Sequence, residues 1–222
     1  RMAGPAVRPL QTGFAQNWLE TTRELVTGPL YYPEPRPAGT LQVQTILSSP
    51  EMGASTVRIM YYLSIICARE SILIANPYFV PDEAAVVALK EAKGRGVNVQ
   101  IMVSGIHNDN WWARHNSVRL YGPLLAEGIV ILEYNQTMLH QKTMVVDGVW
   151  ATIGTTNFDN RSFALNEESN VCVYDHKGAA EFAKIFRADM AQCERVELSA
   201  WQNRGAWSKT KELIASLLQD QA

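Results

Sequence analysis

The chain has 222 residues, of which 47% are hydrophobic and 19% are charged, so it can bury the core of one large domain. Its 20 Lys and Arg side chains nearly balance 22 Asp and Glu, which argues against a basic, non-specific nucleic-acid surface and makes nucleic acid an unlikely partner. Three cysteines without C-x-x-C spacing argue against a disulfide framework or a thiolate metal site, and no apolar run is long enough to span a bilayer.

The first 40 residues are predicted to form a helix and a stiff connection. Residues 4–26 carry Pro5 in the first turn and place Leu10, Phe14 and neighbouring apolar side chains on one stripe, which is typical of an amphipathic helix. Residues 28–39 contain four prolines and two glycines. Such a segment is a surface loop or a linker between two lobes, and its length favours the linker.

Beyond residue 40, predicted strands and helices alternate, as in an α/β protein. Strands are predicted at residues 41–47, 71–75, 97–103, 129–134, 139–147, 149–153 and 169–174. Helices are predicted at residues 54–70, 82–93, 110–127, 178–195 and 206–220. The first of these helices is apolar enough to be buried, and Cys67 with it. Asp147-Gly148 predicts a tight hairpin, so the sheet should contain antiparallel pairs.

The residues suited to chemistry lie between positions 140 and 157. If they lie on a strand, His140 and Lys142 point to the same side, about 6–7 Å apart. An imidazole can attack phosphorus or transfer a proton near neutral pH, and an ammonium beside it neutralises phosphate oxygens. Gly154 permits close approach of another backbone segment. The Thr155 hydroxyl and the Asn157 amide can donate hydrogen bonds to a phosphate.

The spacing H-x-K-x(4)-D-x(6)-G-[ST]-x-N in residues 140–157 resembles the signature of the phospholipase D superfamily. Within it, Asp147 lies at an odd spacing from His140 and at the turn, so we expect it to hold the hairpin rather than contact substrate. The resemblance implies an α/β fold, an α-β-α sandwich lobe with a mixed sheet flanked by helices. It also implies a downstream acid that hydrogen-bonds the catalytic imidazole, for which Glu168 is the first candidate and Glu167 the second.

Other segments resemble the second half of bacterial cardiolipin synthases, notably residues 76–82, 93–97 and 157–163. Enzymes of that kind carry two signatures, and this chain carries one. The resemblance therefore implies that residues 1–40 are the helix and Pro-rich linker of a preceding lobe and that residues 41–222 are a second catalytic lobe. Either a missing first lobe or a second copy of the chain would complete the site, and we favour the missing lobe.

The implied reaction is phosphatidyl transfer between two phosphatidylglycerols, giving cardiolipin and glycerol through a phosphohistidine intermediate. His140, Lys142, Asn157 and Glu168 would supply one half-site, with Lys142, Thr155 and Asn157 on the phosphate and no metal or cofactor. The full-length protein is expected at the bacterial inner membrane, with this stretch itself soluble.

Three alternatives stay open at this stage: a phospholipase D that uses water, a nuclease, and a silent lobe that binds lipid or a protein partner. Asp109 and Asn110 are predicted to close the site from a loop. Trp111 and Trp112 are predicted either to contact lipid or to face the core, with equal weight.

Overall fold

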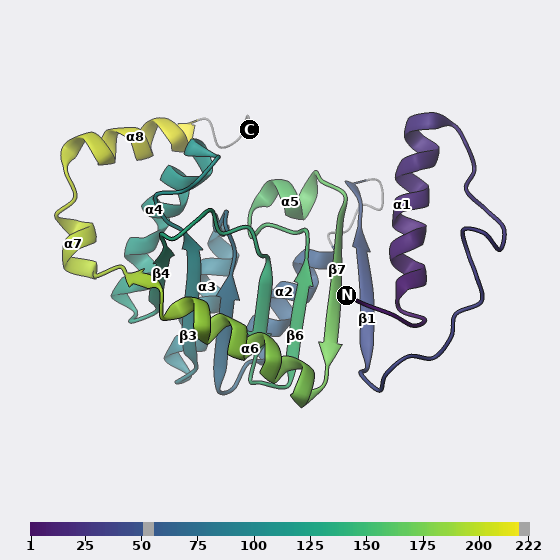
Figure 1. Cartoon of the computed structure of the whole chain (residues 1–222). Coiled ribbons are helices and arrows are strands. Elements are labelled where there is room, and N and C mark those ends of the chain that lie inside the picture. The colour runs from purple at the N-terminus through teal and green to yellow at the C-terminus, as the bar shows by residue number, and fades with distance from the viewer. Residues whose placement is uncertain (51–55, 218–222) are drawn as a thin grey trace.

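The computed structural model describes residues 1–50 and 56–217, and its centre is one mixed sheet in the order β1-β7-β6-β5-β2-β3-β4-β8 (Figure 1). The strands are β1 (Val43–Ser48), β2 (Ser71–Ala75), β3 (Asn98–Ser104), β4 (Val130–Tyr134), β5 (Thr143–Val146), β6 (Trp150–Gly154), β7 (Glu168–Tyr174) and β8 (Cys193–Arg195). The helices are α1 (Val7–Thr22), α2 (Thr56–Cys67), α3 (Glu83–Gly94), α4 (Trp111–Ala126), α5 (Asn160–Ala164), α6 (His176–Met190), α7 (Leu198–Gln202) and α8 (Ala206–Leu217).

The middle of the sheet is parallel and its flanks are antiparallel. β2, β3 and β4 run parallel, with β5 antiparallel to β2 and β8 antiparallel to β4. The β5–β6 hairpin turns at Asp147-Gly148, as predicted, and β7 and β1 follow it with antiparallel pairing. Parallel strands need helices on both faces, which explains why β2 and β3 are almost continuously buried.

Helices cover both faces of the sheet, so the predicted α-β-α sandwich is confirmed. Alternating side chains of β2 divide between two cores: Ile72 and Ile74 pack with α2, α3 and α4, and Leu73 packs with α6. Asp82 and Asp175 accept backbone hydrogen bonds as N-caps of α3 and α6, which explains where these two helices begin. In Figure 1, α6 crosses in front of the sheet, while α1 stands outside the edge strand β1.

Helix α2 differs from the prediction because only one of its faces meets the sheet. Val57, Tyr61 and Ile65 are buried, but Ile59 and Ile66 are exposed, and so is Cys67, which was expected to be buried. Helix α1 is shorter than predicted and has no buried residue. The predictions for residues 54–55 and 218–220 fall outside the described residues.

The C-terminal third also departs from the sequence prediction. The helix expected at residues 178–195 ends at Met190, and the chain then pairs with β4 as the edge strand β8. Local periodicity does not reveal this pairing, because β8 is only three residues long and is fixed by its partner. Helices α5 and α7 are likewise short and were not predicted. Within the described residues, no helix combines the length and apolarity needed to cross a bilayer.

Candidate active site

The predicted site residues lie at one edge of the sheet, where β2, β3 and β6 end and β5 and β7 begin. His140 and Lys142 immediately precede β5, and Thr155 and Asn157 immediately follow β6. Glu168 is the first residue of β7. The antiparallel register, with Thr143 opposite Ile153, brings the start of β5 to the end of β6. The hairpin therefore brings residues that are separated in the sequence together at the same edge of the sheet.

The segment that holds His140 and Lys142 is not itself part of a strand. β5 begins at Thr143 rather than at residue 139, although Gly154 N still donates to Lys142 O over 3.2 Å. His140 is exposed, whereas the Lys142 side chain is buried and its Nζ donates to His140 O over 3.1 Å. His140 and Lys142 therefore lie just before β5 rather than on it, and they differ in exposure to solvent.

The Lys142 ammonium lies in a largely desolvated and acidic setting. Burial lowers the Lys142 pKa from its ordinary value, and the negative charges of Glu168, Asp109 and Asp159 oppose that shift. Burial in turn raises the Asp159 pKa, although Asp159 caps α5 by accepting from Ser162 N over 2.7 Å. A desolvated cation of this kind interacts strongly with an incoming anion, because little water has to be displaced.

Glu168 makes different contacts from those expected. Its carboxylate accepts hydrogen bonds from the Thr155 hydroxyl and from Asn166 Nδ2, the latter over 3.2 Å. Among residues 1–50 and 56–217, no hydrogen bond joins Glu168 to the His140 ring. The Thr155 hydroxyl, expected to donate to a phosphate, is engaged by Glu168 because β6 and β7 pair next to it, and it also accepts from Ser169 N over 3.0 Å. Glu167 is exposed beside this pair.

The Asn157 loop is fixed by a residue whose role the sequence analysis missed. Asn76 is buried directly after β2, and its Oδ1 accepts from Tyr78 N over 3.3 Å and from Phe158 N over 3.2 Å. Its Nδ2 donates to Thr156 O over 3.3 Å. The Asn157 Oδ1, between these anchors, is buried without a hydrogen-bond partner in the described part of the chain. In the sequence, Asn76 belongs to a segment noted only for its resemblance to cardiolipin synthases. The signal that could have identified its role is a polar residue directly after an apolar strand.

Gly154 lies where no side chain fits. A Cβ atom at this position would be 2.3 Å from Ser169 O and 2.3 Å from Asn170 Oδ1, well inside van der Waals contact. Asn170 in turn accepts from the Thr156 hydroxyl over 2.6 Å and donates to Thr152 Oγ1 over 3.1 Å. The end of β6 is therefore locked to β7 by close approach and by buried hydrogen bonds.

Asp147 lies at the opposite end of β5 from Lys142, about 16 Å away at the rise of an extended strand. Its carboxylate accepts from the backbone N–H groups of Arg69, Glu70 and Ser71 over 2.8–2.9 Å, with φ of 52° at Asp147 itself. This acid ties the hairpin turn to the start of β2.

The loop after β3 completes the rim of the site. The Tyr78 hydroxyl donates to the Asp109 carboxylate, and burial together with Asp109 raises the Tyr78 pKa. Asn110 caps α4 by accepting from Ala113 N over 3.0 Å. Trp111 and Trp112, for which lipid contact and core packing were both open, are exposed and stack edge to face with centroids 4.6 Å apart.

Among the described residues, no cluster of three or more His, Cys, Asp and Glu side chains is suited to hold a metal ion. The groups available for chemistry at this edge are an exposed imidazole, a desolvated ammonium, an amide and a hydrogen-bonded carboxylate.

Comparison with known proteins gives a consistent result. Residues 63–190 match the family described as "Cardiolipin synthase, PLD-like domain". A cardiolipin synthase of Staphylococcus aureus is 34% identical over 98% of this chain and 44% of its own length. The probable cardiolipin synthase YwiE of Bacillus subtilis is 36% identical over 98% of this chain and 43% of its own. The chain thus spans less than half the length of these relatives.

The fold has a solved counterpart as well. The crystal structure of the phospholipase D family member Nuc from Salmonella typhimurium matches with a TM-score of 0.62 at 24% identity, covering 71% of this chain and 99% of that one.

Proposed function

The chain belongs to the family of cardiolipin synthase PLD-like domains, and from this membership we propose that it supplies one half-site of a phosphatidyl transferase. The reaction joins two phosphatidylglycerols into cardiolipin and releases glycerol. The supporting observation is that His140, Lys142, Asn157 and Glu168 share one sheet edge, with the Lys142 ammonium desolvated.

Each residue has a role in this proposal. One histidine of the complete site attacks the phosphorus of the first phosphatidylglycerol and forms a phosphohistidine. The other protonates the departing glycerol oxygen and then takes the proton from the hydroxyl of the second lipid, whose oxygen attacks the phosphorus as the phosphorus–nitrogen bond breaks. His140 fills one of these two roles. Lys142 and the Asn157 amide stabilise the phosphate oxygens, and Glu168 acts as the counter-charge to Lys142 and holds Thr155 in place.

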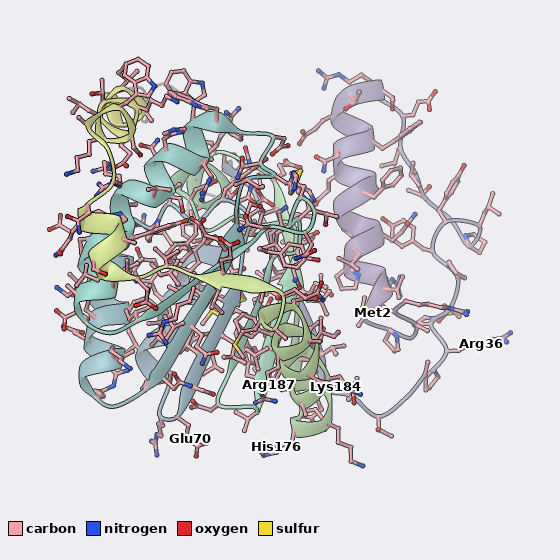
Figure 2. All side chains as sticks on the ribbon, turned by 60° about the vertical axis from the view of Figure 1, so that its left-hand side comes forward. Met2, Arg36, Glu70, His176, Lys184 and Arg187 are labelled. Atoms are coloured by element: carbon pink, nitrogen blue, oxygen red, sulfur yellow. The ribbon has the colours of Figure 1, made fainter. Side chains whose placement is uncertain are left out.

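The half-site needs a second half to be effective. Asp109, Asp159 and Glu168 place negative charge near Lys142, so a second cationic half-site facing it would favour binding of an anionic phosphodiester. His176 lies at the opposite edge of the molecule, as Figure 2 shows, so it does not supply the second imidazole. A first catalytic lobe of the full-length protein, or else a second copy of the chain, is the proposed source.

Residues 1–40 support a preceding lobe rather than a second copy. Helix α1 has no buried residue, although Phe14 and Trp18 stack on it with ring centroids 6.0 Å apart. Exposed aromatic side chains on one side of α1 are expected if, in the full-length protein, this helix packs against a sheet formed by residues that precede it. We propose that residues 41–222 are the second catalytic lobe and that the complete enzyme works at the inner membrane of a bacterium.

The test uses the full-length protein with phosphatidylglycerol vesicles and identifies the lipid products. Cardiolipin and free glycerol are the expected products. His140→Ala should abolish turnover, whereas His176→Ala, at the far edge of the sheet, should keep it. Phosphatidic acid alone would show that water is the acceptor and would replace the transferase with a phospholipase D. No lipid turnover at all would overturn the proposal and favour nucleic-acid substrates or a silent lobe.

A further inference from the structure

Helix α8 turns its acidic side chain inward and its large apolar side chains outward. Glu212, the one acidic side chain among residues 206–217, is 2% exposed. Trp207 and Leu213 on the opposite side are 71% and 61% exposed, and Ile214 is exposed as well. A surface helix of a water-soluble domain normally has the reverse arrangement. The outward face of α8 is therefore suited to an environment less polar than water.

Specific contacts fix this orientation. The Arg204 guanidinium donates to both oxygens of Glu212, over 2.6 and 2.7 Å, and its carbon lies 3.7 Å above the Trp201 ring centroid. Asn116 Nδ2 on α4 donates to Ala215 O over 3.2 Å. Rotating α8 to bury its apolar side would break a bidentate, buried ion pair, which is strongly unfavourable. The apolar face is held outward by the fold.

The charges beside this face are positive. Lys209 and Lys211 lie on α8, and neither takes part in a salt bridge among the described residues. The Lys211 ammonium lies 5.6 Å from the Trp207 ring centroid, so cation and aromatic ring share one side. Because the acid of the helix is turned inward and neutralised by Arg204, the outward face combines apolar and cationic side chains without an acid of its own. This combination is complementary to an anionic lipid surface.

The face lies at the catalytic end of the molecule. Figure 1 shows α8 above α4, at the end of the molecule where α5 lies. Helix α4 begins with the exposed Trp111 and Trp112, and the loop before it exposes Ile106. Tryptophan side chains favour the boundary between headgroups and acyl chains. We propose that the exposed side of α8, together with Trp111 and Trp112, docks on a bilayer that contains anionic lipid and holds the catalytic edge against it.

Another charged surface of the chain lacks these features. Helix α6 carries the exposed Lys184 and Arg187, which Figure 2 places far from α8, but Ile185 is its one exposed large apolar side chain. A surface with positive charge but no apolar face is expected to bind an anionic bilayer only weakly and in a salt-sensitive way. Lys184 and Arg187 therefore provide a matched charge control for the docking face.

The test measures partitioning of the 222-residue chain onto vesicles by flotation, with phosphatidylglycerol-containing and pure phosphatidylcholine vesicles. Binding should require phosphatidylglycerol. Leu213→Ser combined with Trp207→Ser should lower the partition coefficient by about 10- to 100-fold. Ile66→Ser combined with Ile185→Ser, at two positions that are each 52% exposed, should change it less than twofold.

A charge series separates electrostatic from apolar attraction. Lys209→Gln combined with Lys211→Gln should lower binding to phosphatidylglycerol vesicles by about 10- to 30-fold. Lys184→Gln combined with Arg187→Gln on α6 removes the same charge and should lower it by no more than about twofold. Equal loss in both pairs, or equal binding by all variants, would overturn the docking proposal.

The choice of phosphatidylglycerol as the lipid rests on the proposed function. A second measurement therefore distinguishes a failure of the docking proposal from a failure of the proposed function. In the full-length protein, turnover of phosphatidylglycerol vesicles is compared with turnover of a short-chain, monomeric phosphatidylglycerol. The docking proposal expects Trp207→Ser/Leu213→Ser to lower the ratio of vesicle to monomer turnover about 10-fold. An unchanged ratio contradicts docking even if the enzyme is active. Vesicle binding through α8 without turnover of either lipid contradicts the proposed function and leaves docking standing. If the native chain has the mass of a dimer in solution and the α8 variants do not, while vesicle binding is unchanged, the outward face of α8 contacts a second copy of the chain instead.

Discussion

Replacing Asn76 with alanine removes the side chain that joins the end of β2 to the Asn157 loop. The Phe158 N–H and the Thr156 carbonyl are buried and would each lose a hydrogen-bond partner, while the Tyr78 N–H is only partly buried. An unsatisfied buried group costs about 1–3 kcal/mol, so two of them predict a loss of about 2–6 kcal/mol in the free energy of unfolding.

The measurement is urea unfolding of the 222-residue chain followed by circular dichroism. Asn98→Ala is the matched control: Asn98 is exposed at the start of β3, and a surface substitution of this kind should change stability by less than about 0.5 kcal/mol. Because Asn157 lies between the two anchored residues, Asn76→Ala should also lower kcat of the full-length enzyme about 10-fold or more at temperatures where it stays folded. A loss in stability below about 0.5 kcal/mol for Asn76→Ala would refute this reasoning.

Three further predictions test the buried Lys142, the exposure of the cysteines and the close approach at Gly154. Lys142→Met should leave the unfolding free energy at pH 7 unchanged or raise it by up to about 1 kcal/mol, because burial lowers the Lys142 pKa below its ordinary 10.5. The unfolded chain binds that proton more tightly than the folded chain does. The unfolding free energy of the native sequence should therefore rise with pH between the lowered pKa and pH 10.5, and that of Lys142→Met should not. A decrease of more than about 2 kcal/mol in the unfolding free energy of Lys142→Met at pH 7 contradicts this reasoning. Maleimide labelling at pH 8, mapped by mass spectrometry, should modify the exposed Cys67 first and spare Cys172, whose pKa burial raises to about 11; equal rates would be incompatible with the structure. Gly154→Ala should lower the melting temperature by an amount equivalent to about 2–4 kcal/mol because its Cβ would contact a main-chain oxygen of β7, whereas Gly94→Ala, with open space around it, should not; similar melting temperatures for the two variants would disprove the close approach.

The sequence determined most of the sheet because its strands and helices carry strong local patterns. The apolar runs of β2 and β3, the Asp147-Gly148 turn and the acid-capped start of α3 can each be recognised within a short window. The spacing from His140 to Asn157 could also be recognised locally, because these residues lie on one hairpin and its immediate flanks. A fixed register then brings them to one edge without help from distant segments.

Contacts between distant segments could not be predicted in this way. Glu168 bonds to Thr155 rather than to His140, because the choice of partner depends on how β6 and β7 pair. The role of Asn76 depends on a loop that follows a different strand. The short strand β8 exists because the free edge of β4 offers backbone groups that need partners, which no helical or strand periodicity encodes.

The same division applies to burial. The sequence by itself determined that α2 and α8 are helices with apolar side chains, since period and propensity are local properties. Only the tertiary structure decided which side faces water: α2 meets the sheet with one face and exposes Cys67, and α8 turns Glu212 inward because Arg204 neutralises it there. Exposure depends on what packs against a residue, and those neighbours are brought together by the whole fold rather than by adjacent sequence.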